Sequence, residues 1–184
     1  MSGESSSQDL LVKVQKKVLG KMVGKNSIKL VVDDNISVVL DDFYKWAKIE
    51  SGKATAEKLL KDAIKLVVKT GVLFHNKQID QGEIKNWEIL RSKINNIANT
   101  ICYFHRTPFT YNKDMLHGQL DSADTLLKTA LKPHVTEKTI GRVENVFGWL
   151  KKTEHLDSLY STKHDALRED MITKLEVLLE KDGI

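Results

Sequence analysis

Residues 58–74 form a segment whose apolar surface is too wide for a helix that lies on one side of a core. Four lysines at helical spacing mark a single narrow polar strip: Lys58, Lys61, Lys65 and Lys69. Apolar side chains fill most of the remaining circumference: Leu59, Leu60, Ala63, Ile64, Leu66, Val67, Val68, Val72, Leu73 and Phe74. A surface helix needs an apolar stripe of only about 100°. This helix must therefore be covered on several sides, either by other helices or by an apolar ligand.

The helical period recurs along the whole chain. Apolar residues three and four apart predict helices over about 8–23, 33–50, 54–75, 81–106, 112–132, 136–152 and 162–181, with a short helical turn at 154–160. Ser51-Gly52, Pro108 and Pro133 mark helix ends. The sequence shows almost no alternation of apolar and polar residues with period two, so we expect no β-sheet. We predict an all-α protein, an antiparallel bundle of about six to seven helices.

The residues on the apolar stripes of these helices are the ones that we expect in the core. In chain order they are Val39, Leu40, Phe43, Trp46 and Ala47, then Trp87, Leu90, Ile94, Ile97, Ile101 and Phe104, then Leu116, Leu120, Ala123, Leu127 and Ala130, then Ile140, Val143, Phe147 and Leu150, and finally Leu167, Met171, Leu175 and Leu178. Each set follows the spacing that puts side chains on one helix face.

The length of 184 residues is sufficient for one domain with a substantial core. We expect residues 1–7 to be disordered and residues 8–184 to form a single helical domain, with a basic first helix at about 8–23 and a body at about 33–184. No apolar run approaches the roughly 18 residues of a membrane span. The single cysteine, Cys102, fits a reducing compartment, and the polar N-terminus carries no secretory signal. We therefore expect a cytoplasmic protein.

The positive charge is concentrated at the start of the chain. Residues 1–32 hold six lysines against Glu4 and Asp9, so the whole net charge of +4 belongs to this arm and the remaining residues sum to zero. A basic arm on a neutral body indicates an anionic surface as its partner. A solvated leading helix without a partner is the alternative interpretation.

Recognisable catalytic and metal-binding patterns are missing from the sequence. The six histidines include no pair at the i, i+4 spacing of a zinc helix, and no phosphate-binding glycine loop or G-x-S-x-G turn is present. Cys102 lies in the apolar run TICYF and reads as a buried, inert thiol. The pairs Asp33-Asp34 and Asp41-Asp42 are adjacent on a helix and do not face each other. We expect no enzyme activity, no metal and no cofactor.

Nucleic acid is not expected as a partner. The basic arm has no interleaved aromatic residues, which single-stranded nucleic acids use for stacking. Trp46, Trp87 and Trp149 fall on apolar stripes, where packing in the core explains them.

Five stretches of sequence are distinctive in their order: QKKVLGKM at 15–22, VLDDFYK at 39–45, AEKLLKDAIKLVVKTGVLFHN at 56–76, HVTEKTIGRVENVF at 134–147 and LEVLLEKDGI at 175–184. With them, residues 8–184 resemble the tumour necrosis factor-α-induced protein 8 family, also called the TIPE family, as an invertebrate or otherwise divergent member. The block HVTEKTIGR is the most distinctive single stretch.

The resemblance implies a fold and a function. The fold is a cylinder of antiparallel helices around a central hydrophobic cavity, and the function is to bind and transfer phosphoinositides. Family members regulate cell death, immune signalling and cell migration rather than catalysing reactions. Acyl chains of a phosphoinositide or another two-chain lipid would occupy the cavity, for which we expect these lining residues: Val39, Phe43, Leu66, Val67, Leu73, Ile94, Ile101, Leu120 and Phe147. We expect a monomer that associates reversibly with anionic membrane lipids and has signalling proteins as possible further partners.

The resemblance also implies roles for basic residues. Lys16, Lys17 and Lys21 match the membrane-contacting helix of the family. Arg91 matches a basic residue at the cavity entrance. On periodicity alone it lies at the edge of its apolar stripe, where an arginine that only covers apolar surface also sits.

His75 stands where the family has a second arginine. A neutral imidazole is a poorer phosphate ligand, so headgroup affinity should be weaker or pH-dependent. Lys77 or Lys93 could compensate for the missing arginine, which the sequence alone does not show. Trp149, in the run VFGWL, also departs from the family and would reduce the cavity volume.

Two functions remain open at this point. One is the lipid-binding regulator. The other is a protein-interaction adaptor with a solid helical core, whose basic N-terminal arm binds an acidic partner protein.

Overall fold

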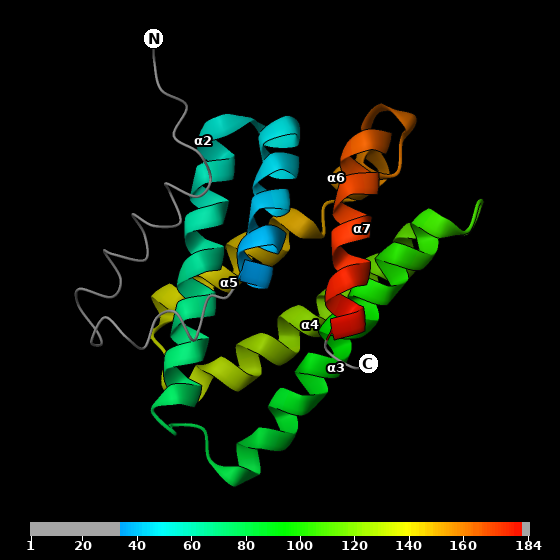
Figure 1. Ribbon diagram of the computed structural model, residues 1–184. Helices are drawn as coiled ribbons and strands as arrows, with labels where there is room; N and C mark the ends of the chain where they lie inside the picture. Colours follow the sequence, from blue (N-terminus) through cyan, green and yellow to red (C-terminus); the bar gives the residue numbers. More distant parts are fainter. Residues whose placement is uncertain (1–33, 182–184) are drawn as a thin grey trace. The chain divides into compact units, whose positions relative to one another are not determined.

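The protein is described by a computed structural model over residues 34–181, shown in Figure 1. The predicted disordered start, the predicted first helix at 8–23 and its residues Lys16, Lys17 and Lys21 lie outside the described residues. The chain divides into two compact units between Gln78 and Ile79. The single domain expected over residues 8–184 stays a prediction.

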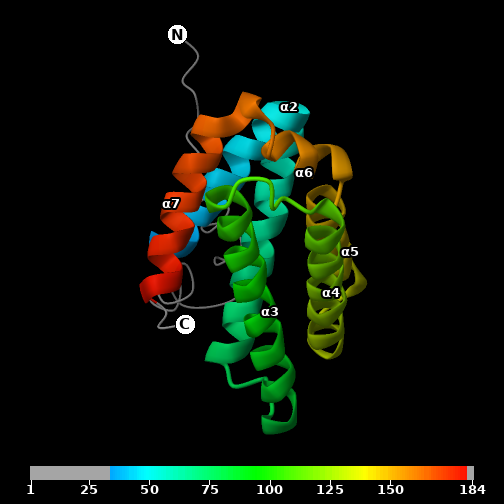
Figure 2. The same cartoon turned by 90° about the vertical axis from the view of Figure 1, so that its right-hand side faces the viewer.

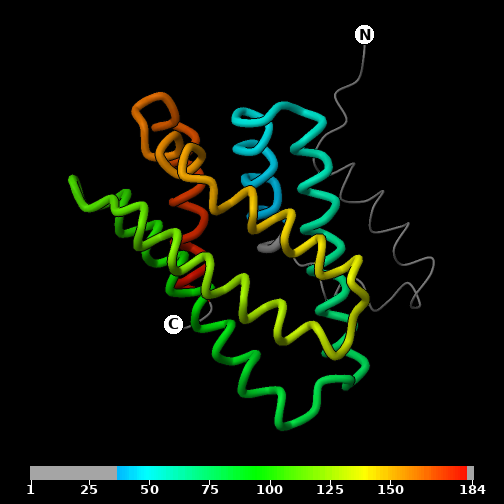
Figure 3. Tube along the Cα trace, turned by 180° about the vertical axis from the view of Figure 1, so that it is seen from behind, coloured from blue at the N-terminus to red at the C-terminus, as the bar shows by residue number. Residues whose placement is uncertain are grey.

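The first unit contains α2 (Asp34–His75), which consists of two helical limbs that meet at Gly52. Figures 1 and 3 show the two limbs side by side, with the corner between them. Gly52 has φ 78°, and an added Cβ would meet nothing within 4 Å. The requirement for glycine is therefore one of backbone conformation and not of space. The predicted interruption at Ser51-Gly52 is confirmed.

The wide apolar surface on the second limb of α2 is buried. Every leucine and most other apolar residues of this limb are shielded from solvent: Leu59, Leu60, Ala63, Ile64, Leu66, Val68, Val72 and Leu73. Lys58 is exposed, and Lys61, Lys65 and Lys69 are half-buried, as befits a narrow strip between buried faces. Phe74 differs from the expectation and keeps 46% of its surface exposed.

Over residues 79–181 the second unit consists of five α-helices and two short 3₁₀ turns. They are α3 (Gln81–Arg106), α4 (Lys113–Leu131), η1 (Lys132–His134), α5 (Glu137–Leu150), α6 (Thr153–Leu159), η2 (Thr162–His164) and α7 (Asp165–Lys181). Within this unit α4 packs on α3 and on α5, and α7 packs on α3 (Figure 2). Residues 34–181 contain no strand, so the predicted all-α fold is confirmed.

Local sequence explains where these helices begin. Asp80 and Glu83 form a reciprocal cap at the start of α3: the Glu83 amide donates to Asp80 Oδ1 at 2.9 Å, and the Asp80 amide donates to Glu83 Oε2 at 3.0 Å. Asn112 caps α4 by accepting a hydrogen bond from the Met115 amide. These caps satisfy amides that have no partner inside a helix.

Most of the buried residues in each unit are apolar, and all three tryptophans are among them. Trp46, Trp87 and Trp149 are buried, which confirms their interpretation as packing residues. Cys102 is a free, buried thiol, and burial raises its pKa to about 11, so it is the inert cysteine that was expected.

The prediction was less accurate for the last helix. Leu167, Met171, Leu175 and Leu178 are only half-buried, whereas Ile172 is the most deeply buried residue of α7. None of the described helices combines the length and the hydropathy of a membrane span.

Candidate functional site

Arg91 and Lys93, the two cations predicted for a lipid headgroup, both belong to α3. Arg91 is exposed and Lys93 is half-buried, and neither forms a hydrogen bond or an ion pair with another described residue. Side chains two residues apart on a helix do not face each other. Arg91 is therefore the more accessible cation, and a joint role with Lys93 stays a prediction.

His75 is the last residue of α2, and the backbone after it forms a helix-ending motif. The Gln78 amide donates to the Leu73 carbonyl at 2.9 Å, and the Lys77 amide donates to the Phe74 carbonyl at 3.0 Å. Lys77 has φ 53°, a conformation that usually selects glycine at this position. His75 and Lys77 are both exposed, so both are accessible to an anion.

The residues predicted to line an apolar cavity differ in their exposure. Leu66, Leu73 and Leu120 are buried, and a second group is half-buried: Phe43, Val67, Ile101 and Phe147. Val39 and Ile94 expose 40% and 49% of their surface. A cavity among these side chains stays a prediction.

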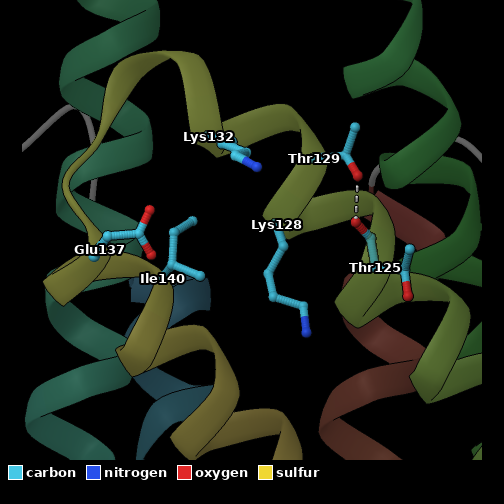
Figure 4. A pocket seen from close by; sticks show the side chains of 6 residues that line it. All are labelled: Thr125, Lys128, Thr129, Lys132, Glu137 and Ile140. Atoms are coloured by element: carbon cyan, nitrogen blue, oxygen red, sulfur yellow. Dashed lines mark hydrogen bonds between the residues drawn. The ribbon is translucent and has the colours of Figure 1, made fainter.

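A groove that sequence reasoning missed lies between the end of α4 and the start of α5. Its volume is about 350 Å³, and its lining residues are Thr125, Lys128, Thr129, Lys132, Glu137 and Ile140. Figure 4 shows these side chains around one space, with Lys128 and Lys132 on one side and Glu137 and Ile140 on the other. The spacing of Thr125, Lys128, Thr129 and Lys132 was the available signal, because it places them together on one helix face.

The charges in this groove are only partly neutralised. Lys128 Nζ lies 3.3 Å from Oδ1 of the buried Asp124, whose Oδ2 accepts a hydrogen bond from Lys151 at 2.8 Å. Lys132 and Glu137 are exposed and form no ion pair with a described residue. A charged, open groove suits polar or ionic groups of a partner and does not suit an acyl chain, which needs a dry apolar pocket.

A second cluster of charges joins α3 to α7. Arg106 donates to Glu169 at 2.8 Å and to Glu176 at 2.7 Å, and His105 Nε2 lies 2.5 Å from Glu169. The hydrogen bond from His105 is the largest cause and those from Arg106 the next, and together they lower the pKa of Glu169 to about 2. Because each of these charges has a partner inside the protein, the cluster holds α7 against α3 and leaves no charge for a ligand.

The described residues offer no metal-binding group of three or more histidine, cysteine, aspartate or glutamate side chains. The fold and these sites define a small all-α protein that has accessible surface cations, a charged groove and, shielded from solvent, a broad apolar face on α2.

The chain belongs to the Tumor necrosis factor alpha-induced protein 8-like family, whose profile matches residues 5–182. It is 37% identical over 157 residues to "Tumor necrosis factor alpha-induced protein 8" of Gallus gallus, covering 85% of this chain and 84% of the relative. It is 34% identical over 155 residues to "Protein salivary glands marred" of Drosophila melanogaster, covering 84% of this chain and 82% of that protein. A "Tumor necrosis factor alpha-induced protein 8-like protein" of Drosophila pseudoobscura pseudoobscura is 32% identical over 170 residues, covering 92% and 89% of the two chains. The family membership expected from the sequence is confirmed.

Proposed function

We propose that this protein binds phosphoinositides or other two-chain lipids and moves them between membranes as a regulator of cell death, immune signalling or cell migration. It acts in the cytoplasm without catalysing a reaction. Acyl chains lie in an apolar cavity of the body, the headgroup binds Arg91 with His75 and Lys93, and the N-terminal arm meets the membrane through Lys16, Lys17 and Lys21.

The buried surface of the second α2 limb carries this proposal. At 100° per residue, its buried apolar side chains from Leu59 to Leu73 span roughly 260° of the helix circumference. A helix on the surface of a core needs a stripe of only about 100°, so this helix is covered on several sides, and the wall of a lipid-holding body is one arrangement that provides such cover. Each methylene shielded there stabilises the bound lipid by about 0.8 kcal/mol.

Charge completes the proposed mechanism. Arg91 is exposed and has no partner among the described residues, so its guanidinium is available to two phosphate oxygens at once. The lysines of the N-terminal arm would add about 1 kcal/mol each close to an anionic leaflet.

Native mass spectrometry after incubation with phosphoinositide-containing liposomes tests the proposal. We expect a retained two-chain lipid, and we expect Arg91→Glu to lose it. Lys85→Glu is the matched control, because Lys85 is an exposed cation on the same helix with no partner among residues 34–181, and it undergoes the same charge reversal. An apo mass that never changes, from folded protein, would contradict lipid binding, and equal losses in both variants would contradict a specific role of Arg91.

Filling the cavity tests where the acyl chains lie. Leu66→Trp should abolish lipid extraction while the helical circular dichroism is retained. Overpacking a buried position lowers stability by about 1–3 kcal/mol. Phe43→Trp, at a half-buried position, is therefore a second variant that fills the cavity with less strain. Full lipid transfer by both folded variants would contradict the cavity mechanism.

The groove between α4 and α5 favours a second function, that of an adaptor for a partner protein. Lys132 and Glu137, which form no ion pair within the described part of the chain, line one groove and are accessible to charged side chains of a partner. An adaptor would lose its partner in the charge reversal Lys132→Glu and would be indifferent to Leu66→Trp. Pull-down of one identified partner with both variants separates the two functions.

A further inference from the structure

The loop between α3 and α4 presents the most exposed large apolar side chain among residues 37–181. Phe109 is fully exposed, and Pro108 before it is exposed as well. Tyr103 in the last turn of α3 and Met115 in the first turn of α4 expose 55% and 50% of their surface. Figure 2 shows the loop as the green arc that connects the two helices.

The backbone at Phe109 is in a conformation that the residue does not favour. Pro108 and Phe109 form the centre of the turn, and Phe109 has φ 62°. A turn with proline first and a left-handed second residue normally selects glycine or asparagine for the second position. A bulky residue at positive φ is a genuine outlier. Because its ring is fully exposed, Phe109 gains no packing within the fold that would offset this strain.

Several polar side chains around the loop already form hydrogen bonds inside the protein. Residues 107–112 carry no charge, and Thr110 Oγ1 donates to the Thr107 carbonyl at 2.7 Å. At the base of the loop, Asp157 accepts hydrogen bonds from the Tyr111 hydroxyl at 2.9 Å and from Lys113 at 3.2 Å. The tip therefore offers apolar atoms with no accompanying charge.

We propose that Phe109 is a membrane anchor that inserts into the interfacial region of a lipid bilayer, with Pro108 and the flanking Tyr103 and Met115 at the bilayer surface. Aromatic rings are enriched at that depth. A protein partner would need a fitted surface of about 800 Å² per side, whereas a fluid bilayer accepts a single protruding ring. This inference rests on the proposed function, because that function brings the protein to a bilayer. Insertion of Phe109 itself requires neither Arg91 nor an anionic headgroup.

Vesicle co-sedimentation with Phe109→Asn tests the anchor. Asparagine adopts positive φ more readily than phenylalanine, so the thermal unfolding temperature should not fall. Binding to phosphatidylcholine vesicles, without and with phosphoinositide, should weaken about tenfold. The loss should persist in 1 M NaCl, where the Debye length falls from about 10 Å at 0.1 M to about 3 Å. Val177→Gln, at a residue with 45% exposure on α7, is the control and should bind as the parent protein does.

Fluorescence of Phe109→Trp gives an independent measurement. The native tryptophans are buried, so emission from an exposed residue at 109 is separable and should shift to the blue on addition of phosphatidylcholine vesicles. Absence of this shift, or unchanged vesicle binding of Phe109→Asn, overturns the inference. A role of Phe109 in self-association, seen as an altered oligomeric state without an effect on vesicles, also overturns it.

The two proposals fail in different ways. Insertion at Phe109 with no lipid retained in native mass spectra would refute lipid transfer and keep the anchor. Retained lipid that depends on Arg91, without insertion at Phe109, would refute the anchor alone.

Discussion

Replacing Arg168 by methionine should destabilise the protein far more than the same replacement of Arg106. Arg168 lies on α7, and its guanidinium reaches the end of α6: Nη1 donates to the Leu159 carbonyl at 2.6 Å and to the Ser161 carbonyl at 3.0 Å. Its Nε donates to His105 Nδ1 at 2.9 Å, and Nη2 pairs with Asp165. Only 11% of the Arg168 side chain is exposed.

The magnitude follows from what the loss of Arg168 leaves behind. The carbonyl of Leu159, the last residue of α6, and the carbonyl of Ser161 just beyond it would lose their charged donor, and a hydrogen bond to a charged group contributes about 1.5–3 kcal/mol. These bonds are not additive, so we expect Arg168→Met to lower the free energy of unfolding by about 3 kcal/mol. For a chain of this size that corresponds to a melting temperature lower by roughly 6–12 °C.

Arg106 provides the matched comparison. It makes as many hydrogen bonds, to Glu169 and Glu176, but 43% of its side chain is exposed and its partners are 52% and 36% exposed. Exposed ion pairs stabilise by about 0–1 kcal/mol each because solvent screens them. Arg106 helps to lower the pKa of Glu169, but Arg168 should contribute more to stability because far less solvent reaches its side chain.

Urea unfolding of both variants, followed by far-ultraviolet circular dichroism, measures the difference. Arg168→Lys adds a test of geometry, because it keeps the charge but loses the planar fork, and it should recover little of the loss. A cost for Arg106→Met that equals or exceeds the cost of Arg168→Met would refute the reasoning from burial.

Three further outcomes follow from the structure. Lys77→Gly should raise the free energy of unfolding by up to about 1 kcal/mol in urea titration, because glycine accepts φ 53° without strain; a loss of stability would contradict this cap. Gly52→Ala should lower the free energy of unfolding by about 1–2 kcal/mol, because φ is 78° at this corner of α2. An unchanged midpoint of urea unfolding would show that the corner tolerates a side chain. The carboxylate of Glu169, with its pKa lowered to about 2, contributes its full stability above its ordinary pKa of 4.5, and this contribution is lost as the pH falls from there through 2. Glu169→Gln should therefore flatten the acid limb of a stability-against-pH curve between pH 4.5 and 2, and an acid limb as steep as that of the parent protein would contradict this.

Much of the fold was readable from the sequence because helix formation is local. Apolar spacing of three and four residues placed the described helices, and Ser51-Gly52, Pro108 and Pro133 placed interruptions between them. The deep burial of the second α2 limb followed from the width of its apolar surface, and the burial of Cys102 followed from its apolar neighbours. The family was recognisable as well, since it depends on the order of short sequence stretches and not on their packing.

Other features depend on residues that are distant in sequence, and only the tertiary structure decided them. The burial of Ile172 depends on the rotation of α7 against its neighbours, which the period of one helix does not fix. Arg168 stabilises the protein because α6 and α3 bring carbonyls and His105 to it. The groove forms only where α4 and α5 face each other. The positive φ at Lys77 and at Phe109 could not be predicted from the sequence, because neither residue type favours it. The sequence thus determined the helices and their apolar faces, whereas packing decided which polar groups found partners and which apolar side chains stayed in solvent.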